Sequence, residues 1–190
     1  MNNSDLTKHI KERRFHGDIK PYEENLKQFD VDFERTFSYI GVFLYLNIIM
    51  EQHIDDILEL HLAKNRRGFN GAAFKSLLLH GRFFNIYEKQ KIFGDLTKST
   101  FLFFNLVKKE EAKNIRKLIN NTINHRNIIA HNRFGISVTS KNPIFKYYEG
   151  VKIKEHELTQ KQMTNHLEDV NNVIKYLKHL KPIINRHESK

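Results

Sequence analysis

Three side chains suited to RNA cleavage lie close together in the sequence, at Arg126, Asn127 and His131. A histidine titrates near neutral pH, so it can take a proton from a 2′-hydroxyl or give one to a leaving oxygen. An arginine can stabilise the charge that grows on the reacting phosphate. An asparagine amide can orient that phosphate or hold one imidazole tautomer. Because RNA supplies its own nucleophile, this segment predicts phosphodiester cleavage without a metal ion.

The composition limits the other kinds of chemistry that we expect. The chain has no cysteine, which excludes disulfides and thiolate catalysis. It has no His-Glu-x-x-His motif, clustered acids or glycine-rich phosphate loop, so neither a metal site nor a cofactor is predicted. The formal net charge of +10 favours a polyanionic partner, nucleic acid first and an acidic protein second. No secretion signal or membrane-spanning stretch is evident, so we expect a cytoplasmic protein that does not associate with membranes.

The segment ends a stretch with helical periodicity, from Glu110 to His131. On an ideal helix Arg126 falls on the apolar stripe, where a charged guanidinium requires an anion, either a carboxylate or a phosphate. A second row on the same helix is polar. Asparagine is unfavourable inside helices, so this row is either functional or simply solvated. The row contains Asn120, Asn124, Asn127 and His131.

Arg126 and His131 are separated by about 140° on an ideal helix. They therefore do not share a face of one straight helix. Either the helix frays near Ala130, or the arginine and the histidine meet across a dimer axis. This angle is one sequence argument for a homodimer. The other is that the middle of the predicted helix 30–64 is apolar all round and should be covered on two sides, the second cover being another copy of the chain.

Each candidate residue also has a purely structural interpretation. His131 could satisfy carbonyls at the end of its helix. His125 is interpreted as a neighbour of the site rather than a participant. Phe101 to Phe104 are expected in the core rather than as a platform for bases. Arg126 could instead form a structural ion pair, with Glu51, Asp55 or Asp56.

The rest of the chain predicts a mainly all-α protein with one domain. Residues 1–28 are a polar, irregular lead-in, and the domain covers residues 29–187. Gly94 is expected to cap the second long helix, and Pro182 to end the last one. Thr159 and Gln162 form a capping box before that last helix. The expected long helices are 30–64, 72–93, 110–131 and 160–180, with a short helix in 100–107.

Before the last helix, apolar residues recur at every second position instead of every third or fourth. Alternation at Ile136, Val138, Phe145 and Tyr147, with turn signals at 141–143 and at 149–150, predicts a small β-hairpin or meander over about 136–157.

The run from His125 to His131 resembles the Arg-polar-x3-His signature of HEPN-domain ribonucleases. The resemblance implies a HEPN-like bundle of about four to five helices with a β-hairpin insertion. It also implies a metal-independent endoribonuclease for single-stranded RNA, with a composite site across a homodimer. Arg126 and His131 match the catalytic pair, and Asn127 matches the polar position. Such proteins are toxins or phage-defence effectors, so a cognate antitoxin or regulatory protein is a possible partner.

Other residues near the motif are expected to bind the substrate: Asn120, Asn124, His125 and Arg133. Many HEPN toxins carry a tyrosine two residues after the histidine, where this chain has Arg133. That departure argues against the subtype that is regulated by tyrosine modification. The alternative is a catalytically inactive HEPN-like module that binds RNA or a partner protein.

Overall fold

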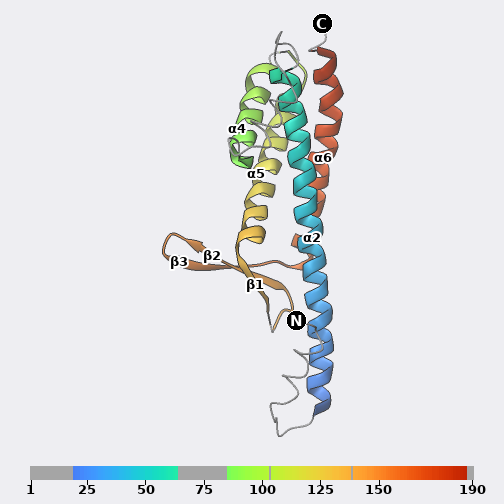
Figure 1. Ribbon diagram of the computed structural model, residues 1–190, viewed down its shortest axis with the longest axis vertical. Helices are drawn as coiled ribbons and strands as arrows, with labels where there is room; N and C mark the ends of the chain where they lie inside the picture. Colours follow the sequence, from blue (N-terminus) through green and yellow to red (C-terminus); the bar gives the residue numbers. More distant parts are fainter. Residues whose placement is uncertain (1–18, 64–84, 103, 138, 188–190) are drawn as a thin grey trace.

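The computed structural model is mostly helical, with a small antiparallel sheet at one side of a helical bundle (Figure 1). It describes residues 19–63, 85–102, 104–137 and 139–187. Within these ranges the elements are α2 (Ile19–Ala63), α4 (Ile86–Leu96), the π-helical turn η2 (Thr97–Phe101), α5 (Lys109–His131), β1 (Arg133–Ile136), β2 (Pro143–Glu149), β3 (Lys152–Glu157) and α6 (Gln160–His187). The predicted all-α class is thus confirmed in its coarse form.

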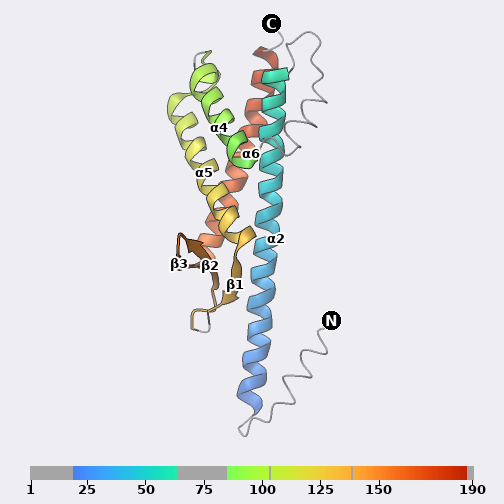
Figure 2. The same ribbon diagram turned by 60° about the vertical axis from the view of Figure 1, so that its left-hand side comes forward.

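The longest helix, α2, runs beside α6 in both views, and α4 and α5 lie together on the bundle (Figures 1 and 2). The core consists of apolar side chains from these four helices and from the sheet. Phe43, Phe93, Phe101 and Phe145 are among its largest fully buried members. The expectation that Phe101 to Phe104 lie in the core is confirmed for Phe101 and is wrong for Phe104, which is exposed. No helix in the described part of the chain is both long and apolar enough to cross a bilayer.

Two helix starts differ from the expectation. α2 begins at Ile19, so the end of the predicted irregular lead-in is helical. Residues 72–84 of the predicted second helix lie outside the described residues, and a helix begins at Ile86. The backbone of Asn85 is extended there. Its side-chain Oδ1 accepts from the backbone N–H groups of Tyr87 and Glu88, and its backbone N–H donates to the Glu88 carboxylate. This capping box starts a helix where the apolar pattern alone indicated continuity.

Two helix ends also differ, for reasons of packing. The expected cap Gly94 lies inside α4, where it is buried. A β-carbon at Gly94 would lie 3.4 Å from Arg116 Nε, an ordinary van der Waals contact, so the Arg116 side chain of α5 packs against this turn of α4. α6 continues past Pro182 to His187, because Leu180 and Ile184 are both buried and hold the helix on either side of the proline. The capping box of Thr159 and Gln162 is confirmed.

The predicted β-hairpin is a three-stranded antiparallel meander that begins at Arg133. Phe134 pairs with Phe145 in β2, and Phe145 pairs with His156 in β3. The expected turns are present, with positive φ at Lys141 (58°) and Gly150 (62°). The first strand starts earlier than predicted because the chain leaves α5 directly into it.

An aromatic clamp fixes this junction to α2. The ring of Phe134 stacks on Phe33 at 5.9 Å and meets Phe37 edge-on at 5.2 Å. Its other neighbour is Phe145, at 6.0 Å between ring centroids. We call Phe33, Phe37, Phe134 and Phe145 the aromatic clamp. Its member Phe134 lies only three residues after His131.

Candidate functional site

The structure brings together the three residues that were predicted to be catalytic. α5 stays helical to His131. Asn132 then has an extended backbone, and its side-chain Nδ2 donates to the carbonyl oxygen of Ile128 at 2.9 Å. Arg126 Nη1 donates to Asn127 Oδ1 at 3.1 Å and lies 3.2 Å from His131 Nε2. We call Arg126, Asn127 and His131 the α5 triad.

The α5 triad forms within one chain, so the angular argument for a dimer is wrong. The ideal-helix angle describes Cβ directions, whereas the long arginine side chain can extend along the helix end to the imidazole. The helix also does not fray at Ala130. Any case for a dimer must therefore come from other features.

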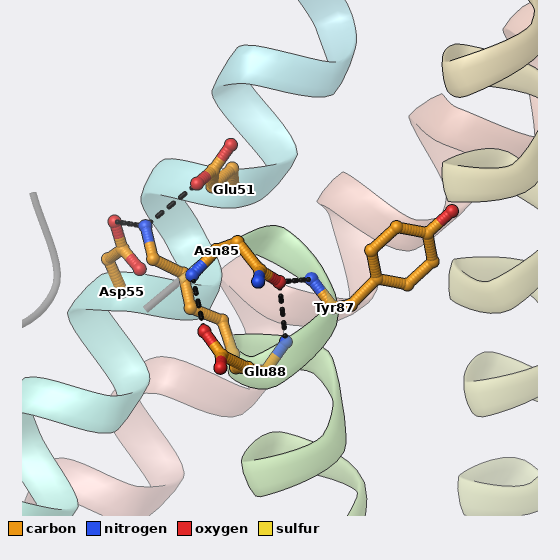
Figure 3. A network of polar contacts seen from close by, with 6 residues as sticks. Glu51, Asp55, Asn85, Tyr87 and Glu88 are labelled. Atoms are coloured by element: carbon orange, nitrogen blue, oxygen red, sulfur yellow. Dashed lines mark hydrogen bonds and ion pairs between the residues drawn. The ribbon is translucent and has the colours of Figure 1, made fainter. Parts of the chain in front are cut away.

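Tyr87 joins the α5 triad from a neighbouring helix. Asn127 Nδ2 donates to the Tyr87 hydroxyl, which fixes which end of the asparagine amide faces Arg126. Figure 3 shows the Tyr87 ring pointing away from the Asn85 capping box towards a neighbouring helix. The sequence interpretation missed Tyr87, although the Asn-x-x-Glu capping box could have placed it in the first turn of a helix.

Arg126 has no carboxylate partner among the described residues. The three expected alternatives are held by lysines: Lys89 Nζ lies 2.7 Å from Glu51 and 3.0 Å from Asp55, and Lys181 Nζ lies 2.8 Å from Asp56. The structural ion pair proposed for Arg126 is therefore not present.

Arg126 lines a small, mostly apolar pocket of about 170 Å³ between α2 and α5. Leu44, Ile48 and Ile86 are among its apolar lining residues, and Asn47 and Glu51 are its other polar ones; the Glu51 carboxylate is bonded to Lys89. A half-buried cation in such surroundings favours an anionic ligand, because water and protein neutralise it only in part.

Among the described residues, the other predicted substrate residues form no hydrogen bond with the side chains of the α5 triad. Asn120 and Asn124 are exposed on α5, and Arg133 is exposed in β1. Asn120 lines a separate pocket between α4 and α5. His125 packs elsewhere, in a cluster of imidazoles.

That histidine cluster joins the sheet to the helices. The rings of His125 in α5 and His166 in α6 lie 3.9 Å apart, and His156 of β3 lies 6.0 Å from His125. Tyr39 of α2 completes it, with its hydroxyl 2.9 Å from His166 Nδ1. Burial lowers the pKa of His166 to about 4, with a further contribution from the neighbouring imidazoles, and burial also lowers the pKa of His125.

We expect acid to destabilise the protein through the histidine cluster. The unfolded chain binds protons at His166 below about pH 6.5 and the folded chain only near pH 4, so stability falls as the pH drops through this interval. Allowing for solvent screening of a half-buried ring, the loss is about 2 kcal/mol, or roughly 4–8 °C in Tm. Thermal melts at pH 7 and pH 5 measure it.

His166→Gln should reduce this pH dependence, because glutamine can still accept from Tyr39 and does not titrate. His179→Gln is the matched control, since His179 is exposed on the same helix. Equal pH dependence of Tm in the wild type and in His166→Gln would contradict the prediction.

The described residues contain no group of three or more histidine, aspartate or glutamate side chains arranged to hold a metal ion. In comparisons with protein-family models, with curated proteins and with solved structures, no match to this chain was found.

Proposed function

We propose that this protein is a metal-independent endoribonuclease of HEPN type that cleaves single-stranded RNA. The observation that carries the proposal is the contact of Arg126 Nη1 with His131 Nε2 and Asn127 Oδ1, in an arginine without a described carboxylate partner. The motif resemblance and the net charge of +10 agree with an RNA substrate.

The α5 triad accounts for one proton transfer. When Arg126 donates to Nε2, that nitrogen is an acceptor, so the imidazole is neutral and carries its proton on Nδ1. An incoming phosphate draws the guanidinium to itself and exposes the Nε2 lone pair. His131 then removes the proton of the 2′-hydroxyl, whose oxygen attacks the adjacent phosphorus. Arg126 stabilises the charge that develops on the phosphate oxygens.

The reaction also needs a proton donor for the departing 5′-oxygen. The α5 triad contains one histidine, and the ring of His125 is packed in the histidine cluster. A second copy of the chain supplies the missing group: its His131, in the protonated form, gives a proton to the leaving oxygen as the P–O5′ bond breaks. The products are a 2′,3′-cyclic phosphate and a 5′-hydroxyl.

An exposed apolar face of α2 is the surface that we assign to this second copy. Val31, Val42, Tyr45 and Ile48 are each about half or more exposed, and they fall within about 120° of the helix circumference. Ile48 also lines the pocket that holds Arg126, so this face is continuous with the α5 triad. A contiguous exposed apolar surface of this kind is typical of an interaction site.

Tyr45→Glu should convert a homodimer into a monomer and abolish cleavage with it, because a carboxylate cannot be buried in an apolar interface without a partner. Tyr148→Glu is the matched control, since Tyr148 is exposed on β2 away from this face. Sedimentation velocity at micromolar concentration gives the oligomeric state. A wild-type protein that is strictly monomeric would exclude the composite site.

The reaction itself is tested by incubating the wild type with single-stranded RNA in EDTA and identifying the new ends. We expect 2′,3′-cyclic phosphate and 5′-hydroxyl ends, and no cleavage of a strand with 2′-deoxy sugars. Cleavage that requires a divalent metal, or that yields 5′-phosphate ends, would refute the mechanism. A toxin or phage-defence role is proposed on the resemblance, and growth arrest on expression, relieved by His131→Ala, tests it.

A further inference from the structure

A second pocket, of about 240 Å³, lies between α4 and α5. Its cations come from three elements: Lys91 of α4, Lys98 of η2 and Arg116 of α5. Asp95 is its one acidic side chain, and Asn120 adds an amide. We call this the basic pocket.

The three cations of the basic pocket are not neutralised within the described part of the chain. None of them forms an ion pair with a described carboxylate, including Asp95 in the same pocket. Elsewhere in the bundle, by contrast, Lys89 and Lys181 are paired with acids. Three positive charges around one hollow with a single acid leave a net positive field that attracts an anion.

The local backbone brings these cations to the pocket. Arg116 Nε lies 3.4 Å from the position of a β-carbon at Gly94, an ordinary packing distance, so the arginine side chain rests against α4 at Gly94. α4 then continues into the π-helical turn η2, which contains Lys98. π-Helical turns are rare and frequently occur at functional sites.

Two residues connect the basic pocket with the α5 triad. Tyr87 lines the pocket, and its hydroxyl accepts from Asn127. Asn120 belongs to the polar row that ends at His131. Arg116 precedes Arg126 by ten residues, or about 15 Å along the helix. This distance corresponds to about four stacked nucleotides of one strand.

We propose that the basic pocket binds backbone phosphates of the same single-stranded RNA, several nucleotides from the bond that is cut. The identity of the ligand rests on the proposed function. Arg116, Lys91 and Lys98 contact phosphate oxygens, and Asn120 contacts the strand between the pocket and the α5 triad. The half-exposed ring of Tyr87 offers a face on which a base can stack. A substrate must therefore be longer than a trinucleotide to use both sites.

The test measures binding of a fluorescent twelve-nucleotide 2′-O-methyl RNA, which lacks the nucleophile and stays intact. Arg116→Gln should raise Kd roughly five- to tenfold and reduce the slope of log K against log salt by about 0.7 between about 50 and 200 mM salt. Lys117→Gln is the control: Lys117 is exposed on the same helix, it does not line the pocket, and the change in charge is equal. A 2′-O-methyl trinucleotide should bind both variants as it binds the wild type.

Equal affinity and equal salt slope for Arg116→Gln and Lys117→Gln would overturn the inference. So would a trinucleotide that loses as much affinity as the long strand, or a duplex that binds as tightly as the single strand. Failure of the proposed reaction is distinguishable. A wild type that binds the modified strand through Arg116 but does not cut ordinary RNA supports the pocket and refutes only the catalytic mechanism.

Discussion

His131→Ala should lower kcat/KM for RNA cleavage by about 10²–10⁴-fold, because it removes the group that accepts the 2′-hydroxyl proton. Arg126→Ala should cost about 10²–10³-fold, since the charge on the phosphate is then stabilised by solvent alone. The double variant should be little worse than the poorer single variant, because the two side chains act on the same transition state. Rates on a fluorogenic oligoribonucleotide in EDTA measure these effects.

Two further variants make this result specific. Arg126→Lys keeps a positive charge but loses the planar fork that contacts Asn127 and His131 and that could bind phosphate in a bidentate way, so it should remain strongly impaired. His179→Ala alters an exposed histidine of α6 and should retain full activity. Undiminished cleavage by purified His131→Ala and Arg126→Ala would leave the α5 triad without a catalytic role.

Lys89→Met should lower the free energy of unfolding by about 3–5 kcal/mol. Lys89 and Asp55 are almost fully buried, and Lys89 Nζ bonds to Asp55 and to Glu51 (Figure 3). Removing the cation leaves the Asp55 carboxylate buried without its ammonium partner. Urea denaturation monitored by circular dichroism, with the midpoints compared at constant m-value, measures the loss.

Lys181→Met is the matched control for Lys89→Met. It breaks a pair of similar length with Asp56, but both side chains are partly exposed, so the cost should be at most about 1 kcal/mol. Adding Asp55→Asn and Glu51→Gln to Lys89→Met removes the two carboxylate charges that contact Lys89 in the wild type and should restore much of the stability. The account of a buried charge network is wrong if Lys89→Met costs no more than Lys181→Met.

Sequence periodicity predicted the parts of the fold that one apolar stripe controls. The stripe on α5 predicted a helix close to its observed bounds, and the Thr159 capping box marked the start of α6 correctly. The turn at Gly150 was visible because glycine tolerates its positive φ, and the turn at 141–143 because asparagine and proline are typical turn residues. Each of these signals is local, so it does not depend on the rest of the chain.

The errors arose where tertiary contacts determine the local structure. Gly94 resembled a helix cap, but it is buried inside α4, where the Arg116 side chain of α5 packs against it. Pro182 resembled a stop, but burial of Ile184 carries α6 beyond it. The angle between Arg126 and His131 on an ideal helix describes the directions of their Cβ atoms. It did not take into account that the long arginine side chain can extend to the imidazole. Tyr87 was missed because it is distant in sequence and joins Asn127 only after the helices pack.

The aromatic clamp has a thermodynamic consequence for the α5 triad. Final turns of helices usually fray, so a side chain there loses conformational entropy when it engages a ligand. Here the chain leaves the helix at His131 and is held three residues later, where Phe134 packs on Phe33 and Phe37. Both ends of the last turn are thus ordered when the protein folds. The entropic cost of aligning Arg126 and His131 falls on folding. Under the proposed function, more of the energy of phosphate binding then remains for the transition state.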